Sequence, residues 1–269
     1  MCIRDRSEGE LLVINEEASY LSVTANISIR VNPDVAVESH PYISTGMKDN
    51  KFGITYNNAL ALYIKASKLS SLNIIGIDFH IGSQITSIQP YLDSIKSVRS
   101  LVSELKKENI NITHIDVGGG LGISYEDEDI VSKGDYIKEI TNSLKDLNLT
   151  ILFEPGRSVI GDCGLLVTKL QYIKESETKN FMIVDASMSE LLRPPLYDAF
   201  NKITPVIKRN TNYKTYDIVG PVCESADFLG KERLMNSEVD DFLVIGDVGA
   251  YGFVLSSNYN TRPKPAEYI

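Results

Sequence analysis

The chain has 269 residues, 43% of them hydrophobic, which is enough for one large or two moderate domains with a substantial core. Its net charge of -9, from 27 basic and 36 acidic residues, disfavours a nucleic-acid backbone or an anionic membrane as a partner. The three cysteines, Cys2, Cys163 and Cys223, are odd in number and widely spaced, which argues against a disulfide framework and a CxxC metal site and fits a reducing cytoplasm.

We expect no targeting signal at the start of the chain. The opening MCIRDRSEGE alternates charges instead of forming a signal-peptide apolar region, and no apolar run reaches the roughly 18 residues of a membrane span. Residues 1–6 show no pattern continuous with the strand-like LLVINEEASY that follows, and we interpret them as a non-native leader. The sequence therefore predicts a protein that is neither exported nor membrane-spanning.

Residues 7–160 are predicted to form part of a (β/α)8 barrel. Short apolar runs alternate there with helical patterns, as in strand–helix units around a parallel sheet. We expect strands at ISIRVNP, KFGIT, IIGIDFH, HIDVGGG and ILFEPG, and helices over 57–70, around 92–105 and over 135–147. A complete barrel uses about 250 residues, so roughly five strands indicate that its first units are missing.

Polar or glycine-rich clusters follow three of these strands. They are His80 and Ser83, then Gly118, Gly119 and Gly120, then Glu154, Pro155, Gly156 and Arg157. The loops at the carboxyl ends of barrel strands converge on one mouth, where barrel enzymes carry their chemistry, and glycine amides can surround a phosphate there. Plainer alternatives are a core histidine at His80, a helix cap at Ser83, a tight glycine turn, and an ion pair between Glu154 and Arg157.

Residues 161–269 are predicted to form a second, mostly β domain. After Gly161 the sequence changes to β-rich segments broken by Asn, Gly and Pro turns, namely GLLVTKLQYIK, NFMIVDAS, YKTYDIVG and DFLVIGDVG. The boundary rests on this change of pattern, because no linker or low-complexity tract separates the two parts. The final RPKPAEYI carries no turn signal, so we expect this domain to be truncated.

Three segments of the second domain carry reactive or ionisable side chains. Arg193 and Tyr197 flank a Pro-Pro turn, and Tyr251 lies between glycines, where its hydroxyl could contact a phosphate. In the loop GPVCESADFLG, Cys223 lies beside Glu224, and a neighbouring anion disfavours the thiolate, so the thiol suits proton donation. Surface or packing roles are the alternatives for all of these residues.

Taken in order, seven motifs closely resemble the diaminopimelate decarboxylase family, which has an alanine-racemase-like fold. They are HIGSQ, VGGGLG, EPGRS, LLRPPLYDA, GPVCESADFLG, GAYGF and SNYNTRPKPAE. The resemblance runs from about Ile27 to the end of the chain. It implies pyridoxal phosphate as cofactor, a role in lysine biosynthesis, a barrel followed by a β domain, and a homodimer with active sites shared across the interface.

The resemblance also implies a role for each candidate residue. Those expected at the cofactor are His80, Ser83, Gly118, Gly119, Gly120, Glu154, Pro155, Gly156, Arg157 and Tyr251. Of these, His80 would stack on the ring and Glu154 would pair with the pyridine nitrogen. Those expected at the substrate are Arg157, Arg193, Tyr197, Glu224 and Tyr251. Cys223 would reach in from the partner subunit as the proton donor.

The family's Schiff-base lysine is missing from the sequence. It lies in an early YA-x-KA-N motif that does not occur here, and Lys48 and Lys51 match a different family segment. We therefore expect an inactive fragment of a diaminopimelate decarboxylase. Two alternatives stay open: a decarboxylase for ornithine, arginine or carboxynorspermidine, and a non-catalytic pyridoxal phosphate-binding protein. A buried Arg193 would not help an amine-ended substrate, and a carrier needs no proton donor such as Cys223.

Overall fold

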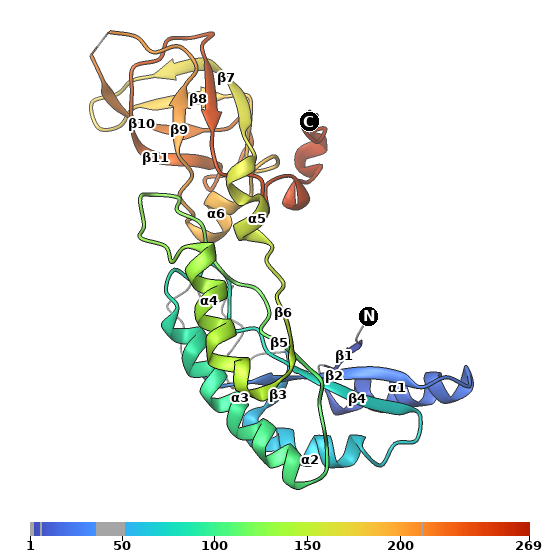
Figure 1. The fold of residues 1–269 in the computed structure, drawn as a ribbon. Helices are drawn as coiled ribbons and strands as arrows, with labels where there is room; N and C mark the ends of the chain where they lie inside the picture. Colours follow the sequence, from blue (N-terminus) through green and yellow to red (C-terminus); the bar gives the residue numbers. More distant parts are fainter. Residues whose placement is uncertain (1–2, 6, 36–51, 211) are drawn as a thin grey trace. The chain divides into compact units, whose positions relative to one another are not determined.

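A computed structural model describes residues 3–5, 7–35, 52–210 and 212–269 (Figure 1). By its contacts the chain divides into two units. Unit 1 comprises Met1–Gly122 and Asp129–Pro155, and unit 2 comprises Ile123–Glu128 and Gly156–Ile269. The division after Pro155 lies close to the boundary predicted near Gly161, whereas the assignment of Ile123–Glu128 to unit 2 has no counterpart in the sequence pattern.

Unit 1 is a parallel sheet with helices between its strands, which confirms the predicted α/β barrel class (Figure 1). The strands lie in the order β1 (Ile3–Asp5), β2 (Ala25–Asn32), β4 (Leu72–Asp78), β5 (His114–Asp116) and β6 (Thr150–Leu152), with β3 (Ile54–Thr55) paired to β2. The helices are α1 (Glu8–Tyr20), α2 (Tyr56–Ala66), α3 (Gln89–Lys107) and α4 (Lys133–Leu144), the last continued by a 3-10 turn over Lys145–Leu147. The strands and helices predicted from residue 27 onward are all present.

The segment LLVINEEASY forms most of helix α1, so its reading as strand-like is wrong. Ser7 accepts a hydrogen bond from the Glu10 amide at 3.2 Å and caps the helix. Leu11, Ile14 and Ala18 recur at helical spacing and pack into the core. The residues before it, interpreted as a leader, contain β1, which pairs in parallel with β2.

Unit 2 is a mostly β unit whose sheet has the strand order β11, β10, β8, β7, β12, β9. These are β7 (Leu166–Lys174), β8 (Phe181–Val184), β9 (Ile203–Pro205), β10 (Lys214–Val219), β11 (Phe228–Met235) and β12 (Phe242–Ile245). Helices α5 (Arg157–Ile160) and α6 (Arg193–Tyr197) are short, and 3-10 turns cover Gly161–Cys163, Phe253–Leu255 and Tyr259–Thr261. The four predicted β segments are confirmed, and β9 and β11 were not predicted.

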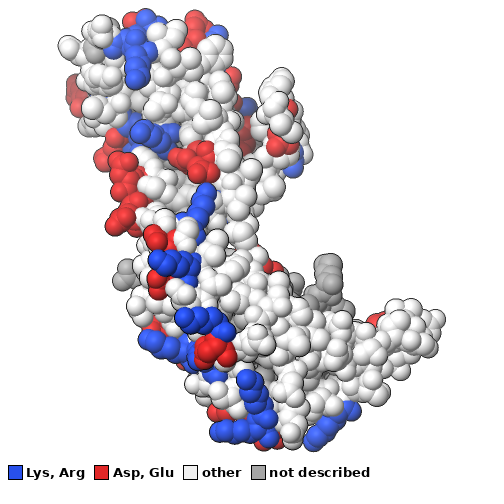
Figure 2. All heavy atoms as spheres, viewed as in Figure 1, with Lys and Arg blue, Asp and Glu red and all other residues white. Residues whose placement is uncertain are grey.

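The two units have separate hydrophobic cores. In unit 1, Ile27, Ile29 and Val31 alternate along β2, which contacts α1 and α2, and they belong to one buried cluster. In unit 2, Leu170 and Met182 belong to a second cluster between the strands. Basic and acidic side chains are interspersed over α3 and α4 (Figure 2). No helix in the described part of the chain is both long and apolar enough to cross a membrane.

Candidate functional site

In unit 1 a glycine loop after β5 brings His80 and Glu154 together. The Gly119 amide donates to Nδ1 of His80 at 3.2 Å, and the Glu154 amide donates to the Gly118 carbonyl at 2.9 Å. The Gly118 amide donates to Oδ1 of Asp116 at 2.8 Å. Because β4, β5 and β6 are parallel neighbours, their carboxyl ends meet at one edge of the sheet. The residues predicted at three strand ends therefore share one loop cluster.

The backbone of this loop leaves no room for a side chain. A Cβ on Gly119 would lie 2.2 Å from the Glu154 carbonyl oxygen, and one on Gly118 would lie 2.5 Å from the Phe79 carbonyl oxygen. Gly118 and Gly120 also have φ values of 69° and 105°, which L side chains rarely adopt. The glycines are therefore required for the close packing of this loop against the neighbouring strand ends, which a side chain would push apart.

The predicted phosphate contact competes with bonds that the loop already makes. The amides of Gly118 and Gly119 donate to Asp116 and His80, so a phosphate would have to share or displace these acceptors. Ser83 is half-buried in the segment that follows His80. The contacts of these glycines and of Ser83 with a phosphate stay predictions, as do those of Pro155 and Gly156, which are exposed at the division between the units.

In unit 2 the two predicted arginines share one tyrosine. Nη1 of Arg157, at the start of α5, donates to the Tyr125 hydroxyl at 2.6 Å. The guanidinium carbon of Arg193, at the start of α6, lies 4.4 Å from the centre of the Tyr125 ring. Only 7% of Arg157, 5% of Arg193 and 7% of Tyr125 is exposed. Two cations are therefore held close together and away from bulk water.

Arg193 is held by a neutral amide. Its Nη1 donates to Oδ1 of Asn201 at 3.1 Å, and the side-chain nitrogen of Asn201 donates to the carbonyls of Gly246 at 2.9 Å and Asp247 at 3.3 Å. Asn201 is fully buried, so its two ends are fixed by these bonds. None of the salt bridges in the described residues involves Arg193.

Burial lowers the pKa of Arg193 below its usual range, and the nearby Arg157 lowers it further. Tyr125, Tyr197 and Asp247 act in the opposite direction. The guanidinium nevertheless stays charged at neutral pH, because arginine is not deprotonated in proteins. A desolvated cation without a carboxylate partner favours an anionic ligand.

Two further predicted residues border the arginines. The ring centre of Tyr251 lies 5.0 Å from the guanidinium carbon of Arg157. Tyr251 has a φ of 60° and is 42% exposed, so it stands on a tight turn with part of its ring in solvent. Tyr197 is the last residue of α6 and is half-buried, and its electrostatic interaction with Arg193 raises the pKa of that arginine. Unit 2 thus brings four of the predicted substrate residues into one region.

The loop after β10 exposes Cys223 and Glu224. The hydroxyl of Tyr259 donates to Oε1 of Glu224, and this hydrogen bond raises the pKa of Tyr259. The base of the loop is closed by Asp227, whose carboxylate accepts from the amides of Met188 at 2.6 Å and Val222 at 2.8 Å. The pair is therefore presented to solvent from an anchored loop.

Three residues of these sites are absent from the sequence-based predictions. Asp227 lies within the loop GPVCESADFLG. A carboxylate inside this glycine-bounded loop was the available sequence signal. Tyr125 and Asn201 carry no such signal, because each meets an arginine that is distant in sequence or on another element. Their roles depend on the return of Ile123–Glu128 to unit 2 and on the path of the chain after α6.

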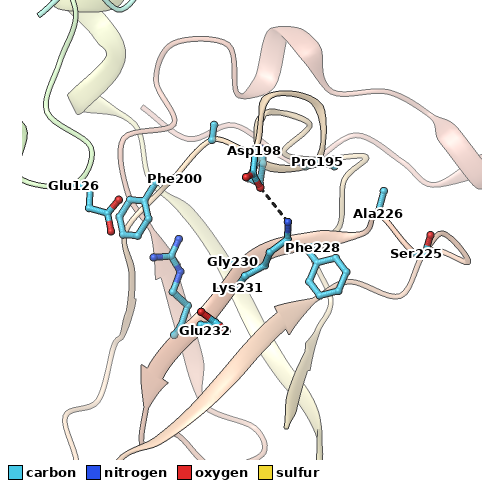
Figure 3. A pocket seen from close by; sticks show the side chains of 13 residues that line it. Glu126, Pro195, Asp198, Phe200, Ser225, Ala226, Phe228, Gly230, Lys231 and Glu232 are labelled. Atoms are coloured by element: carbon cyan, nitrogen blue, oxygen red, sulfur yellow. Dashed lines mark hydrogen bonds and ion pairs between the residues drawn. The ribbon is translucent and has the colours of Figure 1, made fainter. Parts of the chain in front are cut away.

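A pocket of about 530 Å³ lies in unit 2 beside these segments (Figure 3). It is lined by Pro194 and Pro195 of α6 and by Ser225 and Ala226 of the loop, and an ion pair of 3.0 Å joins Lys231 and Asp198 at it. None of the predicted site residues is among its lining side chains. The pocket is a neighbour of the candidate site and does not contain it.

Comparison with known proteins places residues 2–161 in the family described as "Pyridoxal-dependent decarboxylase, pyridoxal binding domain". The chain belongs to the pyridoxal-dependent decarboxylases. It is similar to the diaminopimelate decarboxylases of Vibrio cholerae, at 48% identity over the whole chain, and of Pseudomonas aeruginosa, at 47%. It covers 64% and 65% of the lengths of these two relatives.

A solved structure gives the same likeness within the pyridoxal-dependent decarboxylases. The diaminopimelate decarboxylase of Helicobacter pylori complexed with L-lysine matches with a TM-score of 0.93 at 40% identity. The match covers 98% of this chain and 66% of that one. The predicted resemblance and the two-part fold are thereby confirmed, whereas the roles of single residues stay predictions.

The loop cluster in unit 1 fits the cofactor of this family. His80 supplies an imidazole and Glu154 is a carboxyl-bearing residue, and both lie beside the glycine loop at the carboxyl edge of the sheet. These are the residue types suited to a planar ring with a phosphate arm and a basic ring nitrogen. Lys48 and Lys51, which match a different family segment and are not expected to be the Schiff-base lysine, lie outside the described residues.

Proposed function

We propose that the protein containing this chain decarboxylates meso-2,6-diaminopimelate to L-lysine and CO2, using pyridoxal phosphate. The names of the Vibrio and Pseudomonas relatives, and the L-lysine complexed with the Helicobacter protein, support this substrate and product. The Schiff-base lysine motif of the family is not found in the sequence, so this chain by itself is proposed to be inactive.

The buried pair of Arg157 and Arg193 is the observation that carries the proposal. Diaminopimelate differs from ornithine and arginine in having a second carboxylate at its far end. Two desolvated guanidiniums would bind that carboxylate, and they would repel the protonated amine of an amine-ended substrate. The geometry therefore favours diaminopimelate over the other substrates of the fold.

In unit 1, His80 would hold the face of the cofactor ring and Glu154 would keep a proton at the ring nitrogen. Bound pyridoxal phosphate supplies an acceptor for the electrons that a departing carboxylate leaves behind. The glycine loop would lie against the phosphate arm. These residues would position the cofactor or hold a charge beside it, and none of them would form a covalent bond with the substrate.

In unit 2, Cys223 would donate the proton from its Sγ to the carbon that has lost CO2. Its exposure and its place beside Glu224 suit an encounter with a substrate held elsewhere, and a homodimer would supply it from the partner subunit. Glu224 would bind the distal amine, while Tyr259 orients the Glu224 carboxylate. A role in lysine biosynthesis in the cytoplasm follows from the same proposal.

The test is CO2 release from meso-diaminopimelate, L-ornithine and L-arginine, measured with the chain alone and with the chain extended by its upstream coding sequence. We expect turnover only in the extended protein and only with the substrate that has two carboxylates. Turnover of an amine-ended substrate at a similar rate would assign the protein to another decarboxylase. Cofactor binding without any turnover would indicate a carrier.

A further inference from the structure

Tyr125 is fixed by its own turn. Oε2 of Glu128 accepts the amides of Tyr125 at 2.6 Å and Glu126 at 2.7 Å, and the hydroxyl of Ser124 at 3.2 Å. Three donors on one carboxylate close the segment Ile123–Glu128 into a compact turn. Tyr125 therefore stands on an anchored backbone within unit 2, although the residues before Ile123 and after Glu128 belong to unit 1.

The two ends of Tyr125 hold different arginines. Its hydroxyl accepts from Arg157 at 2.6 Å, while the face of its ring lies 4.4 Å from the guanidinium carbon of Arg193. Asn201 holds Arg193 from another side at 3.1 Å. A phenol, an aromatic face and an amide can all orient a cation without cancelling its charge.

Another arginine of unit 2 shows the alternative arrangement. Arg209 donates through Nε to Asp241 at 3.0 Å and through Nη2 to the same carboxylate at 2.6 Å. That bidentate pair raises the pKa of Arg209, whereas burial lowers the pKa of Arg193. Arg209 is thus neutralised within the protein, and Arg193 retains a charge that a ligand can neutralise.

We propose that Tyr125 and Asn201 are positioning residues that hold Arg157 and Arg193 as a carboxylate-binding pair. The inference rests on the proposed function for the identity of the ligand, an α-amino acid that ends in a carboxylate. It adds two residues that touch neither cofactor nor reacting atoms. Both residues are neutral, so neither cancels the charge of the arginine that it contacts, and their anchoring keeps the two guanidiniums oriented before a ligand arrives.

The first measurement follows the arginines without any ligand. Phenylglyoxal labelling of the full chain, with adducts located by peptide mass spectrometry, reports how firmly each guanidinium is held. Tyr125→Phe removes only the hydroxyl and should speed labelling of Arg157 alone. Tyr125→Leu also removes the ring and should speed labelling of Arg193 as well. Asn201→Ala should act on Arg193, and Tyr172→Phe, on an exposed tyrosine of β7, is the matched control.

The second measurement is calorimetric binding to the protein extended by its upstream coding sequence. The ligands are L-lysine and cadaverine, which lacks the carboxylate of lysine. Loss of one hydrogen bond to a charged group corresponds to a roughly tenfold weaker affinity. We expect Tyr125→Phe and Asn201→Ala to weaken L-lysine binding by that factor and to leave cadaverine unchanged. Circular dichroism identifies a variant that fails to fold. If another variant fails, the result for Tyr125→Phe, which is the mildest change, decides whether the positioning role holds.

The outcomes separate the inference from the function on which it rests. Unchanged labelling of both arginines in Tyr125→Phe and Asn201→Ala overturns the positioning role, whatever ligand binds. Faster labelling together with no L-lysine binding by the unsubstituted protein, extended by its upstream coding sequence, supports the positioning role and contradicts the proposed substrate. Faster labelling with a selective loss of L-lysine affinity supports both.

Discussion

The candidate sites of the two units are built in different ways. In unit 1, His80, the glycine loop and Glu154 come together because neighbouring parallel strands end at one edge of a sheet. In unit 2, Arg157 of α5 and Arg193 of α6 come together because both contact Tyr125, and Asn201 also holds Arg193. Backbone geometry makes the first site, and side-chain packing makes the second.

This difference has consequences for what a substitution can do. A site made by close backbone approach tolerates no added atom, so a change there disturbs the fold of the unit. A site made by side chains on a formed scaffold can lose one contact and keep its fold. The following predictions test this contrast.

The largest effect is expected for Gly119→Ala in unit 1. The new Cβ would lie 2.2 Å from a backbone carbonyl oxygen, and the ends of β5 and β6 would have to separate. We expect a loss of about 3 kcal/mol in the free energy of unfolding, measured by urea denaturation. Gly134→Ala in α4 is the control, since its Cβ would meet only Ser132 Oγ at 3.9 Å. A Gly119→Ala variant as stable as the original would refute the backbone account.

A smaller effect is expected for Asp227→Asn in unit 2. The amide would turn an N–H donor toward the backbone amide of either Met188 or Val222, and that amide would lose its acceptor. We expect the free energy of unfolding to fall by about 1–3 kcal/mol. The exposed Asp198→Asn should change it by less than about 0.5 kcal/mol. Equal effects of the two substitutions would show that Asp227 does not anchor the loop.

The smallest effect is expected at the surface of unit 1. The Arg99 guanidinium donates to Asp146 at 2.6 Å and 2.7 Å and lowers the pKa of that carboxyl to about 2. The pKa of Asp146 is lower in the folded chain than in the unfolded chain. The ion pair therefore stabilises the fold above about pH 4, and this stabilisation is lost as pH falls toward 2. The difference in unfolding midpoint between the chain and Asp146→Asn should therefore shrink over this range.

The exposed Asp129→Asn serves as the control for this pH series. Its difference from the unsubstituted chain should stay small throughout, because surface charges are screened by solvent. If the difference in unfolding midpoint between the unsubstituted chain and Asp146→Asn is constant from pH 5 to pH 2, the stabilising role of the ion pair is contradicted.

Much of unit 1 could be predicted because its signals are local. Apolar alternation marks ISIRVNP as β2, and the glycines and Glu154 follow their strands directly in sequence. The error at LLVINEEASY arose because an apolar run beside acidic residues was read without its helical spacing from Leu11 to Ala18. Short apolar runs do not distinguish strand from helix by themselves.

The scaffold of the unit 2 site could not be predicted from local patterns. Tyr125 and Arg157 are separated by the whole of α4 and β6, and their contact depends on the return of Ile123–Glu128 to unit 2. Strand β11 was missed because its first residues, Phe228–Gly230, complete the loop motif that drew attention to Cys223. Chemical motifs identify the arginines, and only the tertiary structure identifies what holds them.

The most direct test of the account is the substrate selectivity of Arg193→Gln in the protein extended by its upstream sequence. The ratio of kcat/KM for meso-diaminopimelate over L-ornithine should fall by about a hundredfold or more, since a desolvated charge pair with the distal carboxylate is lost. An unchanged ratio in a folded variant would contradict the claim that the buried guanidinium of Arg193 binds the second carboxylate.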